Sequence, residues 1–173
     1  MRIIEIEGEI SAAYQRGDVI CNFVSLNCVM KDALSRKIKK VYRDWSWCVE
    51  YYCRRYVSAY GNGALGRAFG ANHARIGTCD PKYARIVNLF VRKKHYESCN
   101  PVYLRRALED LKRQMIRDGE TNIAILKSSC TKGRRGGEWA GVKGMIEGVF
   151  KDSCVNIYIF MREGVEPHGQ RRG

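Results

Sequence analysis

The feature that most constrains this chain is the alternation of strand-like apolar runs with segments whose apolar residues recur at helical spacing. The strand-like runs are residues 2–7, 18–25, 83–91, 122–127 and 154–160. The helical segments are residues 30–41, 45–58, 100–119 and 138–150. Strands that alternate with helices form a layered α/β sheet, in which ligands bind beyond the carboxyl ends of the strands. We therefore expect an α/β fold with its site at one edge of the sheet.

One predicted helix has both of its ends marked. Asn100 followed by Pro101 is typical of a helix start, because an asparagine side chain caps the first amides and proline suits the first helical position. Gly119 is the expected stop. Residues 59–82 are instead rich in glycine and alanine, which predicts a loop or an irregular hairpin.

The net charge narrows the choice of partners. Lysine and arginine total 31 against 18 acidic residues, giving a formal net charge of +13, and 45% of the residues are hydrophobic. Such a hydrophobic content is typical of a globular protein and not of a disordered basic tail. Surplus positive charge on a folded domain indicates polyanionic partners, such as nucleic acid, nucleotide phosphates or an acidic protein surface. A basic surface that serves only solubility is the alternative.

Several classes of protein are excluded by what the sequence lacks. No run approaches the roughly 18 apolar residues of a membrane-spanning helix, and the N-terminus has the layout of neither a signal peptide nor a transit peptide. The 8 cysteines occur singly without a CxxC motif, and the 3 histidines lie far apart. We expect unpaired buried thiols, no metal and no cofactor, in a reducing intracellular compartment: cytoplasm or nucleus, of a host cell if the source is viral.

Basic residues directly follow one predicted central strand. Arg92, Lys93 and Lys94 come after the strand 83–91, at the edge of the sheet where ligands usually bind. A lysine at this place can hold a phosphate or, if desolvated, act as a nucleophile. A solvated basic strand end is the alternative.

A second basic segment, residues 128–137, also lies between a predicted strand and a predicted helix. It contains Lys132, Arg134 and Arg135, several glycines and no acid. Glycines let a backbone approach an anion, so the segment suits a phosphate or nucleic-acid contact. A simple flexible basic loop is equally compatible with this composition.

Two further patterns have ordinary explanations beside the functional ones. Aromatic residues interleave with Arg54 and Arg55 over 45–58, which suits a base-stacking platform but also a core or a partner interface. Residues 61–66 match GxGxxG literally, but a helical pattern precedes them where a dinucleotide fingerprint needs a strand. We interpret residues 61–66 as a plain turn.

Four segments, taken in order, resemble those of a known family. They are Arg2–Ile10, Val24–Met30, Val91–Lys94 with Asn100–Leu104, and Ile125–Cys130 with Glu138–Trp139. They are similar to an opening strand, a second-strand exit, a strand-Thr-Lys-Lys segment before Pro-x-Tyr-x-x-Leu, and a diphosphate loop before the last helix. The family is the macro domain, the ADP-ribose-binding fold, and the closest resemblance is to the terminal ADP-ribose protein glycohydrolase branch.

The resemblance implies a three-layer α/β/α sandwich with a mixed central sheet over residues 1–160. Around 59–82 it implies an insertion, and we expect the polar residues 161–173 to form a flexible tail. Glu9 stands where the family's acid accepts the adenine amino group, and Lys93 where its lysine attacks the anomeric carbon. The implied ligand-binding residues are Glu9, Ile10, Ser25, Cys28, Lys31, Ser129, Cys130, Thr131, Lys132 and Gly133.

Two departures from the family bear on catalysis. Lys31-Asp32-Ala33 replaces the glycine-rich turn that wraps the distal ribose, and Thr131–Gly137 contains no acid where the family has an acid/base aspartate. General acid–base help contributes about 10² to 10⁴ in rate, so its loss argues against efficient turnover.

We therefore expect a divergent macro-domain protein, non-catalytic or weakly active, that binds ADP-ribose or a nucleotide phosphate or serves as a structural module. Its expected partners are an ADP-ribosylated protein, nucleic acid or an assembly protein. The basic contact surface would comprise Arg54, Arg55, Arg92, Lys94, Arg134 and Arg135. The alternative is a mono-ADP-ribosyl hydrolase with Lys93 as nucleophile.

Overall fold

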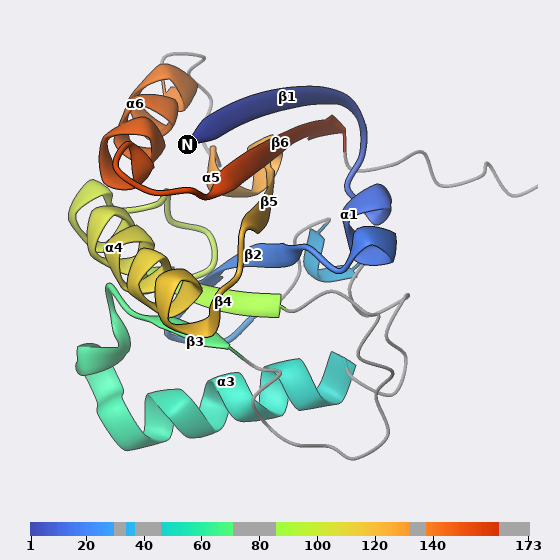
Figure 1. Ribbon diagram of the computed structural model, residues 1–173. Coiled ribbons are helices and arrows are strands. Elements are labelled where there is room, and N and C mark those ends of the chain that lie inside the picture. Colours follow the sequence, from blue (N-terminus) through green and yellow to red (C-terminus); the bar gives the residue numbers. More distant parts are fainter. Residues whose placement is uncertain (30–33, 37–45, 71–85, 132–137, 163–173) are drawn as a thin grey trace, which may run out of the picture.

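The computed structural model describes residues 1–29, 34–36, 46–70, 86–131 and 138–162, in which strands and helices alternate as the sequence predicts (Figure 1). The elements are β1 (Arg2–Glu9), α1 (Ser11–Arg16), β2 (Val19–Ser25), α3 (Ser46–Tyr60), the 3-10 helix η1 (Gly61–Ala64), β3 (Ala68–Gly70), β4 (Ile86–Arg92), α4 (Pro101–Asp118), β5 (Asn122–Leu126), α5 (Lys127–Cys130), α6 (Glu138–Phe150) and β6 (Asn156–Arg162).

Within the described residues, a six-stranded mixed sheet forms the centre of the molecule, with the strand order β1-β6-β5-β2-β4-β3. Neighbouring strands are parallel, except that β3 runs antiparallel to β4. The parallel strands therefore all end at the same edge of the sheet, which we call the carboxyl edge. β1 lies at a border of the sheet and β2 is buried along its whole length, as their sequence patterns predict.

Helices cover both faces of the sheet and make two hydrophobic cores. Along β5, Ile123 and Ile125 belong to one core and Ala124 and Leu126 to the other, because successive side chains of a strand point to opposite faces. α4 and α6 pack on the first face, at the left of Figure 1, and residues of α1 and α3 join the second core. This arrangement is the expected three-layer α/β/α sandwich.

α4 begins and ends where the sequence marks it. The side chain of Asn100 accepts hydrogen bonds from the amides of Val102 at 2.9 Å and Tyr103 at 3.4 Å. Pro101 takes the first helical position, and Gly119 closes the helix in the left-handed conformation with φ of 67°. The capping residues thus determine which residues α4 contains.

Two short elements lie in segments for which the sequence predicts no regular element: a loop or an irregular hairpin over 59–82, and a loop over 128–137. β3 pairs with β4 inside the stretch 59–82, and α5 is a single helical turn that opens the segment after β5. In α5, the Ser129 hydroxyl donates to the carbonyl of Leu126 at 2.7 Å, and the Thr131 hydroxyl donates to the carbonyl of Lys127 at 3.0 Å. Neither element is long enough to show a period in the sequence.

Parts of other predictions lie outside the described residues. These parts are the predicted helix 30–41 except residues 34–36, the remainder of the 59–82 stretch from residue 71, and the tail beyond residue 162. The GxGxxG match follows α3 and begins with η1, so no strand precedes it. Within the described ranges, no helix is long and apolar enough to cross a membrane.

Candidate ligand site at the carboxyl edge of the sheet

The exits of β2 and β4 lie side by side at the carboxyl edge. The two strands stay paired up to Ser25 and Arg92, and the amide of Leu26 then donates to the carbonyl of Arg92 at 3.1 Å. A register shift between Val24 and Ser25 gives β4 one extra residue at this point, which is the pattern of a β-bulge. The segments that follow β2 and β4 therefore begin next to each other at the carboxyl edge.

The turn after β2 is tightly built from polar side chains. The hydroxyl of Ser25 donates to the side-chain oxygen of Asn27, and the amide of Cys28 donates to the carbonyl of Ser25 at 3.0 Å. Cys28 is buried and has φ of 54°, a left-handed conformation that costs a non-glycine residue roughly 1–2 kcal/mol. Such strain persists only where surrounding contacts hold it.

His95 joins this turn to the segment after β4. The Nδ2 atom of Asn27 lies 3.2 Å from Nδ1 of His95, which is a hydrogen-bonding distance between the two side chains. The two residues are 68 positions apart in the chain. Neither residue is marked by a motif in the sequence, although His95 stands two positions after Lys93 in the basic strand exit.

A thiol pair ties the same turn to α3. The thiol of Cys53 donates a hydrogen bond to Cys28, which lowers the pKa of Cys28, and the nearby charge of Arg54 lowers it further. The same hydrogen bond, together with burial, raises the pKa of Cys53. The cysteines that the structure describes are free thiols; of these, Cys99 is partly exposed and Cys154 is exposed.

The exit of β5 turns its side chains inward. Ser129 and Cys130 are buried, and the hydroxyls of Ser129 and Thr131 donate to carbonyls of their own turn. Burial raises the pKa of the Cys130 thiol to about 12, so this thiol stays protonated. Ser129 and Cys130, which the resemblance implies as ligand contacts, therefore have no exposed side chain to offer.

The exit of β1 divides its two implied ligand residues. Glu9 pairs in register with Arg162 of β6 at the carboxyl edge and is partly exposed. Ile10 is completely buried, and its carbonyl accepts a hydrogen bond from the amide of Ala13 at 3.0 Å. Glu9 is thus placed where a ligand at this edge could meet it, whereas the side chain of Ile10 is part of the core.

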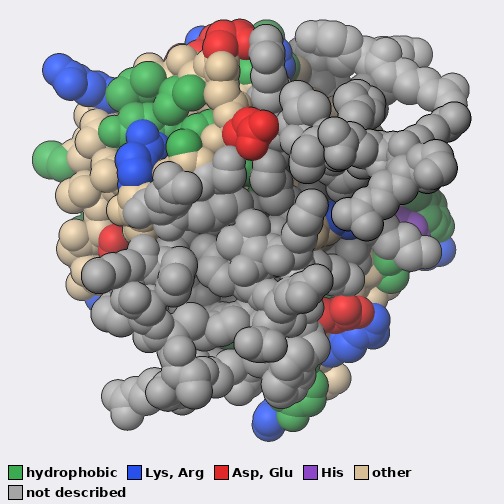
Figure 2. All heavy atoms as spheres, turned by 90° about the vertical axis from the view of Figure 1, so that its right-hand side faces the viewer, with side chains coloured by type: hydrophobic (Ala, Val, Ile, Leu, Met, Phe, Trp, Pro, Cys, Tyr) green, Lys and Arg blue, Asp and Glu red, His purple; other side chains and the backbone are tan. Residues whose placement is uncertain are grey.

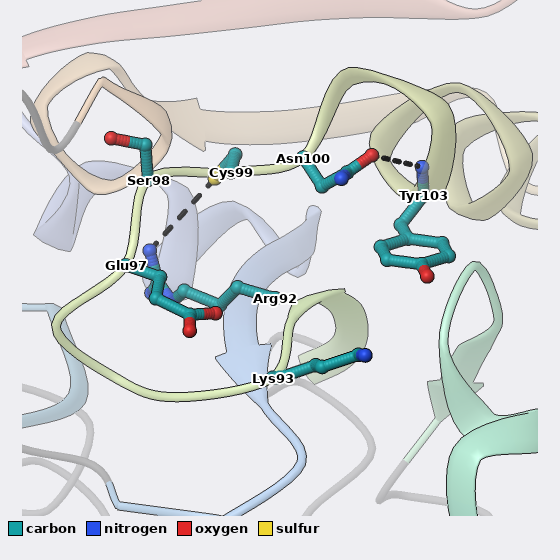
Figure 3. A pocket seen from close by; sticks show the side chains of 7 residues that line it. All are labelled: Arg92, Lys93, Glu97, Ser98, Cys99, Asn100 and Tyr103. Atoms are coloured by element: carbon teal, nitrogen blue, oxygen red, sulfur yellow. Dashed lines mark hydrogen bonds between the residues drawn. The ribbon is translucent and has the colours of Figure 1, made fainter.

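The basic residues at the end of β4 (Arg92) and directly after it (Lys93 and Lys94) have different environments. Lys93 and Lys94 are exposed, but Arg92 is only 2% exposed and points inside the segment 93–99 (Figure 3). The prediction that Arg92 belongs to an exposed basic surface is therefore wrong, because its guanidinium donates to the buried carbonyl of Phe23 at 2.9 Å. A pocket of about 440 Å³ lies beside Arg92 and Lys93.

Comparison with solved structures identifies the fold. The chain superposes on the macrodomain of Thermus aquaticus DarG with a TM-score of 0.71 and 19% identity, over 92% of this chain and 98% of that chain. This chain has the macrodomain fold. No protein-family model matches the sequence, and no curated protein matches it either.

Two further structures with this macrodomain fold contain ADP-ribose. Thermosipho africanus DarTG in complex with ADP-ribose matches with a TM-score of 0.72 and 13% identity, over 96% of this chain and 43% of that chain. The Trypanosoma brucei macrodomain in complex with ADP-ribose matches with a TM-score of 0.58 and 12% identity, over 94% of this chain and 65% of that chain. At these identities the comparison establishes the fold alone.

The basic residues of α3 lie on an exposed face of this macrodomain. Arg54 forms an ion pair with Glu50 at 2.9 Å. The guanidinium of Arg55 lies 5.7 Å from the ring centre of Tyr51, and its Nη1 atom donates to the Tyr51 hydroxyl at 3.4 Å. Figure 2 shows the molecule from the right-hand side of Figure 1. Among the described residues on this side, both positively charged side chains (blue) and negatively charged side chains (red) reach the surface.

Several predicted site residues lie outside the described part of the macrodomain. They are Lys31, Lys132, Gly133, Arg134 and Arg135. Among the described residues, no group of three or more His, Cys, Asp and Glu side chains is arranged to hold a metal ion. The described site thus comprises the exits of β1, β2, β4 and β5. Among these, the turn after β2 and the segment after β4 are joined by the side chains of Asn27 and His95.

Proposed function

We propose that this macrodomain binds ADP-ribose at the carboxyl edge of its sheet and acts as a binding module. The observation that carries the proposal is the linked set of Ser25, Asn27 and His95, which holds the turn after β2 against the segment after β4. A site held in place before binding loses less entropy when the ligand arrives. Two structures of the same fold contain ADP-ribose, which supports the choice of ligand.

The charges near the edge favour an anionic ligand. Lys93 and Lys94 are exposed directly after β4, and the diphosphate of ADP-ribose carries two negative charges. Lysine binds phosphate as a point charge and needs no fixed geometry, so exposed lysines at the edge suit this role. Glu9, at the end of β1, is the candidate to accept the adenine amino group.

Binding without turnover is favoured by the composition of the segment after β5. Residues 131–137 contain no aspartate or glutamate, so this segment cannot supply a carboxylate as general acid or base. The loss of such a group removes about 10² to 10⁴ of rate. We therefore assign recognition of ADP-ribose, free or attached to a protein, as the function.

Calorimetric titration with ADP-ribose tests the proposal. We expect saturable binding by the wild type, and about tenfold weaker binding by Asn27→Ala, since the turn then loses the hydrogen bonds that hold it. Asn62→Ala, in the exposed part of η1, is the matched control and should bind like the wild type. Absence of heat at millimolar ADP-ribose, with a folded protein, would refute the assignment.

A second candidate is hydrolysis of mono-ADP-ribosyl groups with Lys93 as nucleophile. The position of Lys93 at the end of β4, beside a pocket, favours it. The measurement is release of ADP-ribose from a mono-ADP-ribosylated protein by the wild type, by Lys93→Ala and, as control, by Lys151→Ala in the exposed turn after α6. Release by the wild type and the control, but not by Lys93→Ala, supports hydrolysis; equal release by all three removes Lys93 from the reaction.

A further inference from the structure

Arg92 is a cation buried at the end of a central strand. Its Nη2 atom donates to the carbonyl of Phe23 at 2.9 Å, and its Nη1 atom lies 3.9 Å from the sulfur of Cys99, a weak acceptor. Its Nε atom is buried and has no hydrogen-bond partner. Among the residues that the structure describes, no carboxylate forms an ion pair with Arg92.

Burial of such a group requires compensation. A buried charge is costly unless it is paired, and an unused buried donor costs free energy as well. The backbone carbonyl of Phe23 offers only a partial charge, and the thiol of Cys99 offers less. Neither of these partners supplies the full negative charge that would neutralise the buried guanidinium of Arg92.

The pocket of about 440 Å³ beside Arg92 lies between the segment 93–99 and the start of α4 (Figure 3). Figure 3 shows the Arg92 side chain on one side of this space, under Ser98 and Cys99, and the ring of Tyr103 on the other. The volume falls within the range of about 300–1,000 Å³ that is usual for small-molecule pockets. It holds far more than a single ion.

The positive end of α4 also points at this pocket. The 18-residue helix α4 begins at Pro101, and its aligned peptide dipoles place a partial positive charge at that end. The amides of Val102 and Tyr103 are already bonded to the side chain of Asn100. A bound anion would therefore be held by side chains and favoured by the dipole, without free helix amides.

One carboxylate also lines the pocket. Glu97 is exposed, and its carboxylate accepts a hydrogen bond from the amide of Lys94 at 3.2 Å. With Arg92 and Lys93, the lining carries two positive charges and one negative charge. The negative charge of Glu97 repels a bound anion, and replacement of Glu97 by glutamine removes that repulsion.

We propose that this pocket binds the phosphate group of a small phosphorylated molecule, such as a sugar phosphate. The guanidinium of Arg92 binds the phosphate, and Lys93 adds charge at the rim. The face of Tyr103 then packs against the sugar. This site lies on the α4 side of β4 and shares Lys93 with the ADP-ribose site of the proposed function, but the guanidinium of Arg92, which binds the phosphate, takes no part in that site.

Heteronuclear NMR titrations of the full chain with inorganic phosphate and with ribose 5-phosphate test the proposal, with acetate as a carboxylate control. We expect saturable shifts of the backbone amides of residues 97–100 with both phosphates and none with acetate. A smaller dissociation constant for ribose 5-phosphate identifies the sugar phosphate as the preferred source of the phosphate group. Shifts confined to residues 25–29 and 127–131 would overturn the proposal.

Three variants separate binding from folding. Ser98→Glu adds an acid to the lining and should weaken binding of ribose 5-phosphate about tenfold, whereas Ser58→Glu, on the exposed face of α3, should not. Glu97→Gln should strengthen binding several-fold. If Ser98→Glu and Glu97→Gln both bind like the wild type, the pocket is not the site, whether or not a buried Arg92→Met variant folds.

Saturation with ADP-ribose distinguishes this proposal from the proposed function. If ribose 5-phosphate still shifts the amides of residues 97–100 in the saturated protein, the two sites are separate, as proposed. If ADP-ribose displaces it, the phosphate occupies the ADP-ribose site and the separate pocket is refuted. If ADP-ribose does not bind at all, the proposed function fails, while the shifts caused by ribose 5-phosphate still decide the present proposal.

Discussion

At the scale of single residues, Cys28 combines a left-handed backbone with a thiol that accepts a hydrogen bond from Cys53. The donor lies on α3, an element whose position relative to the turn after β2 has no signature in the sequence. The hydrogen bond stabilises the Cys28 thiolate and so lowers the pKa of Cys28. The chemistry of one cysteine thus reports directly on how α3 packs against the candidate site.

Replacement of Cys53 by alanine should raise the pKa of Cys28. The fraction of Cys28 thiolate at a given pH then falls, by about tenfold for each unit of increase in pKa. The pH dependence of the Cys28 Cβ chemical shift, followed by NMR of a 13C-cysteine-labelled protein, measures this change without a reagent that must reach the buried thiol. Cys53→Ser retains a hydroxyl donor and should keep the low pKa, and an unchanged midpoint in Cys53→Ala would contradict the assignment.

At the scale of elements, α4 connects local sequence to the site. Its first turn forms one wall of the pocket beside Arg92, and its apolar stripe of Leu104, Leu108 and Leu111 packs in the first core. The cap at Asn100 fixes where the helix begins, and therefore where Tyr103 stands. The cap at Asn100 therefore helps to position both the residues of α4 that pack in the first core and those that line the pocket.

Asn100→Ala should lower the free energy of unfolding by about 1 kcal/mol, because two amides of the first turn lose their acceptor. Asn100→Asp retains the acceptor and adds favourable charge at the helix start, so its stability should stay near that of the wild type. Urea unfolding followed by circular dichroism measures both. Equal loss of stability in the two variants would show that the cap contributes nothing.

The elements differ in how well the sequence predicts them. β2 and β4 are mostly apolar runs, and the ends of α4 are marked by Asn100 and Gly119, so these elements were predictable. α5 was not, because four residues are too few to show a helical period, and β3 is a strand only through its pairing with β4. Strong periodicity and capping act locally, whereas short elements depend on their neighbours.

At the scale of the whole molecule, the net charge of +13 should produce salt-dependent binding to polyanions. For single-stranded nucleic acid, each phosphate contact contributes about 0.7 to the slope of log affinity against log salt concentration. Arg55→Gln, on exposed α3, should reduce the slope by about that amount if α3 contacts the strand. Fluorescence anisotropy with a labelled oligonucleotide measures the slope.

Arg113→Gln on α4 makes the same charge change elsewhere and is the matched control for α3. Equal slopes for the wild type and Arg55→Gln would exclude α3 from the contact. An association with nucleic acid that does not weaken as salt rises would contradict an electrostatic contact altogether and favour a protein as the partner of this molecule.

The sequence by itself determined the succession of the longer strands and helices, the buried character of β2 and β4 and the ends of α4, because these depend on residues a few positions apart. The short elements α1, β3 and α5 were not among them. Only the tertiary structure decided that Asn27 meets His95, 68 positions away, and that Arg92 reaches the carbonyl of Phe23, 69 positions away. The basic residues after β4 look equivalent in sequence. Packing places Arg92 inside and leaves Lys93 exposed, because only Arg92 faces the space between the β2 exit and Cys99.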